Sequence, residues 1–138
     1  MKKIFSLLLV FISTISFAQK DWKIYTSIKG VNIYTKDADC YFKDGSNMNQ
    51  RVILFKIENT NNKEITIEWD LRVWYNGKES VNNVTPEEKH VVIKIKANSI
   101  LQGDSSLSIR NLYLYKKYLD FEKSQEMTKF VLENLKVT

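Results

Sequence analysis

The sequence has little of the residue types on which most catalytic and metal sites depend. Its 138 residues include one cysteine, one histidine and one proline. A single cysteine excludes a disulfide within the chain, and one cysteine with one histidine leaves no ligand set for zinc or copper. No catalytic motif is present either. We therefore expect neither an enzyme nor a bound cofactor.

A strong excess of one charge is also missing. The chain has 21 basic and 16 acidic residues and a formal charge of +5. Lys2 and Lys3 belong to the leader described below, so residues 19–138 carry 19 basic and 16 acidic residues, spread along the chain. A nucleic-acid-binding domain normally has a dense basic face. The sequence therefore predicts no nucleic-acid partner.

The first eighteen residues have the pattern of a cleavable signal peptide. Lys2 and Lys3 precede an apolar run at residues 4–12, and small residues, Ser16 and Ala18, occupy the positions that a signal peptidase reads. The alternative is a transmembrane anchor, but the apolar run is shorter than the roughly 20 residues that span a bilayer. We expect cleavage after Ala18.

The residue after the predicted cleavage site argues against a lipid anchor. A bacterial lipoprotein needs cysteine at its first mature position, and this position is Gln19. No later segment is apolar enough to cross a membrane. The sequence thus predicts a secreted or periplasmic domain at 19–138, large enough for one hydrophobic core.

The clearest structural pattern lies at Ile65–Tyr75. Its apolar residues alternate strictly with Thr66, Glu68, Asp70, Arg72 and Trp74, which predicts a strand with one buried face and one exposed face. The dipeptide Asn76-Gly77 follows, and it favours a tight turn.

Seven further runs have strand character: 22–26, 31–35, 38–43, 51–57, 90–96, 111–117 and 128–137. The run 51–57 has apolar residues at both odd and even positions, which is typical of a central strand covered on both faces. We expect it to form a hairpin with Ile65–Tyr75. The run 128–137 also fits helical spacing, and its β-branched ending favours a strand. Pro86 lies in a predicted loop at 85–89.

Strands at this spacing predict an all-β fold. Seven or eight short strands separated by turn signals are typical of an immunoglobulin-like, two-sheet antiparallel sandwich. Trp69 shares a parity with the apolar residues of its strand and is expected in the core, with Trp22 packed near it.

Trp74 is the main candidate for binding. Its parity is that of Asp70 and Arg72, so it is expected to point outward and to stack on a sugar or anchor a protein partner. Tyr113 and Tyr115, with Tyr118, would extend this surface. The alternative is that a loop covers Trp74.

Cys40 and His90 are the candidates for any catalysis. Cys40 is expected to be a small hydrophobe in the core, the alternatives being an exposed reactive thiol or half of an intermolecular bridge. His90 opens a strand without a recognisable partner in the sequence, and we expect an exposed residue at a strand edge.

Asp37, Asp39 and Asp44 form a weak calcium candidate. Carboxylates at alternate positions are ligands that calcium prefers, but the spacing does not match a helix-loop-helix calcium loop. An ordinary solvated turn is the favoured interpretation, and we assign no metal site.

The chain resembles small uncharacterised secreted proteins of Bacteroidetes, especially flavobacteria. The leader ending at residues 16–19 matches theirs, and the mature chain matches at Trp22, 30–34, 55–61, Trp69, 74–75, 101–104 and 130–137. Similar sequences carry a cysteine after the glycine turn, where Ser105 and Ser106 stand here. The resemblance implies that Cys40 has lost a disulfide partner, and it implies no activity.

These features together predict a non-catalytic binding or interaction module with an unknown protein or carbohydrate ligand. One alternative is a small extracytoplasmic hydrolase or inhibitor-like protein that uses Cys40 or His90. Another is a structural subunit that assembles by pairing along an exposed strand edge.

Overall fold

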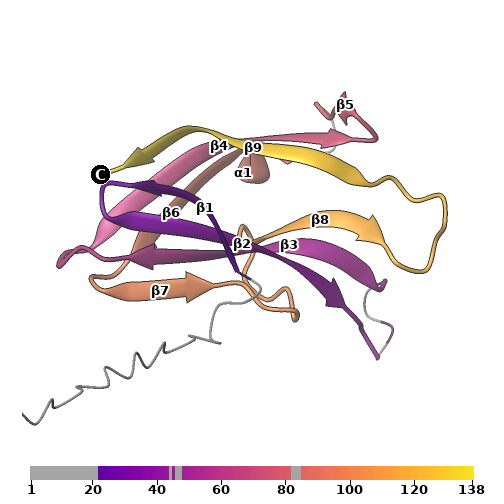
Figure 1. Ribbon diagram of the computed structural model, residues 1–138, viewed down its shortest axis with the longest axis horizontal. Coiled ribbons are helices and arrows are strands. Elements are labelled where there is room, and N and C mark those ends of the chain that lie inside the picture. The colour runs from indigo at the N-terminus through magenta and orange to yellow at the C-terminus, as the bar shows by residue number, and fades with distance from the viewer. Residues whose placement is uncertain (1–21, 44, 46–47, 82–84) are drawn as a thin grey trace, which may run out of the picture.

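The protein is a sandwich of two antiparallel β-sheets packed face to face (Figure 1). The computed structural model describes residues 22–138 except 44, 46–47 and 82–84. The predicted signal peptide, its cleavage site and Asp44 lie outside the described residues. The two antiparallel sheets confirm the predicted all-β, two-sheet sandwich.

The first sheet is built around β3. Its strands are β1 (Lys23–Ile28), β2 (Val31–Cys40), β3 (Gln50–Asn59), β7 (Ser99–Gln102) and β8 (Tyr113–Tyr118). β2 pairs with one edge of β3, while β7 and β8 share the other edge in succession. The two-residue turn Lys29-Gly30 joins β1 to β2, and both residues have positive φ, 48° and 76°. Glycine adopts this conformation without steric cost.

The second sheet is built around β4. Its strands are β4 (Ile65–Tyr75), β5 (Lys78–Glu79), β6 (His90–Ile95) and β9 (Met127–Val137). Trp74 pairs with both Glu79 and Lys129, so β9 lies on one edge of β4, and β5 with β6 on the other. Asn76-Gly77 forms the predicted tight turn, with φ of 49° and 79°.

The core lies between the sheets and follows the alternation of the sequence. Ile65, Ile67, Trp69, Leu71 and Val73 of β4 are all buried, and they pack with inward residues of β3, such as Phe55 and Ile57. A second cluster contains Val52 and Leu54 of β3 together with Cys40. The opposite parity of these residues shows that β3 is covered on both faces, as predicted.

The expected hairpin between 51–57 and Ile65–Tyr75 is wrong. β3 and β4 belong to different sheets, and the loop at 60–64 carries the chain across the sandwich. The predicted position of Trp22 is also wrong, because its ring packs against the second cluster and not beside Trp69. Periodicity assigns a face to each residue but does not assign a partner to each strand.

Five further elements bear on the prediction in detail. The runs 31–35 and 38–43 are largely one strand, β2, and β5 and β7 are additional short strands. The chain ends in strand β9 and not in a helix, as favoured from its sequence. The predicted loop at 85–89 contains the one-turn helix α1 (Pro86–Lys89). Thr85 and Glu88 form a capping box at its N-terminus.

Candidate functional site

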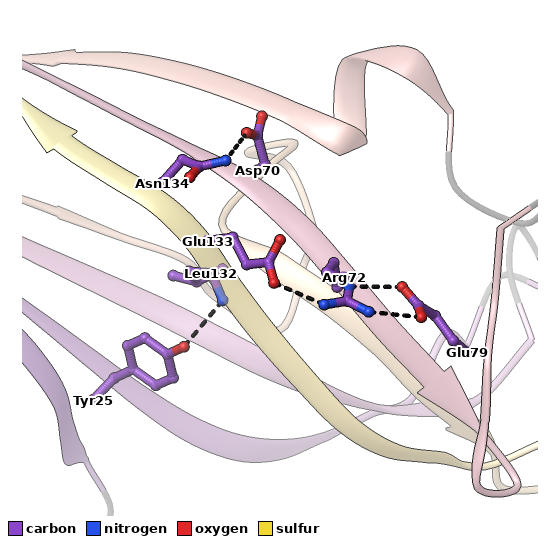
Figure 2. Close-up of polar contacts among 7 residues, drawn as sticks. All are labelled: Tyr25, Asp70, Arg72, Glu79, Leu132, Glu133 and Asn134. Atoms are coloured by element: carbon purple, nitrogen blue, oxygen red, sulfur yellow. Dashed lines mark hydrogen bonds and ion pairs between the residues drawn. The ribbon is translucent and has the colours of Figure 1, made fainter.

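Asp70, Arg72 and Trp74 of β4 lie in a row on the outer face of the second sheet, opposite to the buried residues of the strand. Arg72 donates from Nε and Nη2 to Glu79, at 2.6 and 2.7 Å, and from Nη1 to Glu133 at 2.8 Å (Figure 2). These pairs raise the pKa of Arg72 and lower that of Glu79. The guanidinium is therefore already bound by carboxylates from β5 and β9.

Trp74 points outward as predicted, but its ring is not free. The Arg72 guanidinium carbon lies 4.9 Å from the ring centroid, and the Lys129 ammonium lies 4.7 Å from it. These cation–π contacts leave the side chain only partly exposed. A ligand that stacks on Trp74 would have to displace one of the two cations.

Asp70 is paired with the only histidine. Its Oδ1 lies 2.7 Å from Nδ1 of His90, and its Oδ2 accepts a hydrogen bond from Asn134 at 2.8 Å (Figure 2 shows the second contact). The Asn134 hydrogen bond, followed by the His90 contact, lowers the pKa of Asp70. His90 is exposed at a strand edge, as expected. Its partner lies directly opposite on β4, a relation that the sequence does not reveal.

Cys40 lies apart from this row. It is fully buried in the second cluster of the first sheet, as expected of a small hydrophobe. Burial raises the pKa of its thiol, which disfavours the nucleophilic thiolate. His90 belongs to the other sheet, and the two residues make no contact.

Tyr113 and Tyr115 do not extend the Trp74 surface. Both lie on β8, which pairs with β3 in the first sheet. Tyr113 packs against the second cluster, whereas the Tyr115 ring lies 6.1 Å from that of Tyr75, measured between centroids. The prediction grouped these aromatic residues on one surface because the sequence does not show which sheet β8 joins.

The described residues of the calcium candidate have other partners. Asp37 accepts from the Lys116 ammonium at 2.9 Å, and Asp39 accepts two hydrogen bonds from Arg51, at 2.6 and 3.1 Å. Both lie on β2 and not in the expected solvated turn. Among the described residues, no group of three or more potential ligands is arranged to hold a metal ion.

A large pocket lies between the sheets, beside β8. It has a volume of about 970 Å³, which is within the range of small-molecule sites. Leu71 and Val73 of β4 and Leu114 of β8 supply aliphatic walls. In Figure 1, the segment that joins β8 to β9 connects the two sheets at this end.

Four aromatic rings form a continuous wall of this pocket. Tyr75 contacts Tyr115, Tyr115 contacts Tyr118 at 4.9 Å, and Tyr118 meets the edge of Phe121 at 6.2 Å, all between centroids. We call these four residues the aromatic wall. It runs from β4 across to β8 and into the loop at 119–126.

Hydrogen bonds hold that loop in place before any ligand binds. The Tyr115 hydroxyl donates to the carbonyl of Gln125 at 3.0 Å and accepts from the backbone N–H of Tyr118 at 3.1 Å. The backbone N–H of Asn76 donates to the carbonyl of Glu126 at 2.9 Å. The loop is thereby tied to both sheets, and a preorganised wall reduces the entropy lost on binding.

Tyr75 and Glu88 are half-buried polar residues of the pocket. Burial raises the pKa of Tyr75, and the charges of Tyr115 and Glu88 add to that effect. The Tyr75 hydroxyl makes no hydrogen bond to another described residue. Sequence reasoning missed Tyr75, Glu88 and Phe121. The aromatic-rich run at 113–121 was the available signal, but its partner wall on β4 is distant in sequence.

Comparisons with family models, curated proteins and solved structures find no match to this chain. No helix in the described residues reaches the length and apolarity of a membrane span, since α1 has four residues.

Proposed function

We propose that this protein is a secreted or periplasmic, non-catalytic binding module that holds a small apolar ligand in the pocket between its sheets. The observation that carries the proposal is the cavity of about 970 Å³ with its aromatic wall and aliphatic lining. The signal-peptide pattern of residues 1–18 supports the compartment. We favour the pocket over Trp74 as the binding site because Arg72 and Lys129 already contact the Trp74 ring.

The chemistry of the lining favours binding over reaction. Its buried groups, Leu71 and Val73, are aliphatic and offer neither a nucleophile nor a general base. The hydrolase alternative has less support because Cys40 is buried in one sheet and His90 is exposed on the other. The aromatic wall instead resembles the lining of pockets that bind apolar molecules.

The alternative of a subunit assembled by edge pairing also has less support. β1 and β9 both contain irregularities in register, between Ile24 and Thr26 in β1 and around Asn134, whose φ is 52°, in β9. Such bulges twist a strand edge and hinder its pairing with a second chain.

Fluorescence titration with N-phenylnaphthylamine, a neutral dye that brightens in apolar surroundings, tests the proposal. We expect saturable binding at one site per chain. Phe121→Ala removes one exposed ring of the wall and should weaken binding about fivefold, given roughly 1 kcal/mol for an aromatic contact. Tyr41→Ala is the matched control, because Tyr41 is an exposed aromatic residue outside the pocket.

The outcome is decisive in either direction once circular dichroism shows that both variants are folded. Saturable binding that Phe121→Ala weakens and Tyr41→Ala does not supports the pocket. Absence of saturable binding, or equal loss in both variants, would overturn the proposal.

A further inference from the structure

The charge around the pocket is opposite in sign to that of the whole chain. Three carboxylates line it, Glu88, Asp120 and Glu122, against the single ammonium of Lys123. The chain as a whole carries a net charge of +5. A pocket with apolar walls concentrates the field of such carboxylates, so its entrance attracts cations and repels anions.

The aromatic wall adds a second attraction for positive charge. Elsewhere in the described structure, aromatic rings hold cations of the protein itself. Lys56 lies 4.4 Å from the Tyr34 centroid and 5.1 Å from that of Trp22, and two cations flank Trp74. No lysine or arginine of the described residues lies over the aromatic wall at such a distance. A cation from outside would therefore not have to displace a cation of the described residues from these rings.

Glu88 occupies a suitable place for the counter-charge. It is half-buried, lines the pocket, and lies close enough to Tyr75 for its charge to act on that hydroxyl. Its Oε2 accepts from the backbone N–H of Thr85 at 2.9 Å, which fixes the side chain. The carboxylate is thus held beside the Tyr75 end of the wall.

We infer that the pocket takes an apolar organic cation, such as a hydrophobic amine or a quaternary ammonium compound. Its hydrocarbon body lies against Leu71, Val73 and Leu114, and its positive head lies over the Tyr75 and Tyr115 rings, facing Glu88. This inference rests on the proposed function and adds the charge of the ligand to it.

A series of probes with one body and three charges tests the inference. Phenylbutylamine, phenylbutanol and phenylbutyrate share an apolar body and are cationic, neutral and anionic at neutral pH. In calorimetric titrations at low ionic strength, we expect the amine to bind about tenfold more tightly than the alcohol, from combined cation–π and charge attraction. The anion should bind more weakly than the alcohol. Added salt should reduce the differences in affinity among the three probes, because it screens the charges.

A pair of neighbouring variants locates the effect. Glu88→Gln removes the charge and retains a residue that suits the capping box, and it should reduce the amine-to-alcohol affinity ratio about threefold. Glu87→Gln is the matched control, because Glu87 is exposed, adjacent, and absent from the pocket lining. It should leave the ratio unchanged.

The two proposals fail in different ways. If the alcohol binds at the pocket as tightly as the amine, or if Glu88→Gln leaves the ratio unchanged, the cation inference is wrong and the binding pocket stands. If N-phenylnaphthylamine and all three probes fail to bind saturably, the proposed function itself is wrong.

Discussion

Asn59 connects the two sheets at the residue scale. It is a fully buried polar residue at the end of β3. Its Nδ2 lies 2.9 to 3.1 Å from the carbonyls of Lys63, Ile95 and Lys96, and its Oδ1 accepts from the backbone N–H of Asn61 at 3.0 Å. One side chain thus holds the loop that crosses the sandwich against the end of β6.

Asn59→Ala should destabilise the protein by about 3 kcal/mol, because the two N–H groups of this buried amide and its carbonyl oxygen are lost together, which leaves their backbone partners unpaired. Urea denaturation followed by tryptophan fluorescence measures the free energy of unfolding. Asn62→Ala, at an exposed position in the same loop, is the control and should change it by less than about 0.5 kcal/mol. A loss no larger than the control's would contradict a structural role for Asn59.

Tyr25 has a comparable bridging role at the scale of elements. It extends from β1 in the first sheet to β9 in the second, where its hydroxyl accepts from the backbone N–H of Leu132 at 3.0 Å (Figure 2). Its ring stacks on Phe130 with centroids 5.5 Å apart. This hydrogen bond pairs a backbone N–H at the edge of β9 that could otherwise donate to a strand of another chain.

Tyr25→Phe should lower the free energy of unfolding by about 1 kcal/mol, because it removes the acceptor and retains the ring. Hydrogen exchange should show faster exchange of the Leu132 amide, with little change in the centre of β4. Tyr41→Phe, at an exposed position, is the control. Unchanged exchange at Leu132 would show that the hydroxyl does not protect this edge.

The stability of the protein at acidic pH depends on the molecule as a whole, because carboxylates on several strands make ion pairs and hydrogen bonds with neighbouring strands. The pKa of Asp39 is lowered mainly by its hydrogen bonds from Arg51, that of Asp70 by Asn134, and that of Glu79 by Arg72. A carboxyl group with a lower pKa in the folded state stabilises the fold above its unfolded pKa, near 4. That stabilisation is lost as the pH falls through the folded values.

We therefore expect the free energy of unfolding to be nearly level near neutral pH and to fall below about pH 4.5. Combining Asp70→Asn with Glu79→Gln should make that decline shallower, because two of the linked groups no longer titrate. Denaturation at a series of pH values measures it, with Glu64→Gln as an exposed control. An unchanged slope in the double variant would mean that these pairs do not contribute to acid sensitivity.

The local pattern of the sequence determined much of this fold. Strict alternation at Ile65–Tyr75 assigned a buried or exposed face to each residue, because successive side chains of a strand point to opposite sides. The tight turn at Asn76-Gly77 followed from the preference of this dipeptide for positive φ. The apolar residues of both parities at 51–57 correctly indicated a strand with two covered faces.

Only the tertiary structure decided which strands are neighbours, because pairing depends on contacts between residues far apart in the chain. It separated β3 from β4, placed His90 opposite Asp70, and moved Tyr115 away from Trp74. It also brought the end of β4, strand β8 and the loop at 119–126 together around one cavity. The sequence by itself determined which side of each strand is apolar. The assembly of strands decided where those sides meet, and where a space for a ligand remains between them.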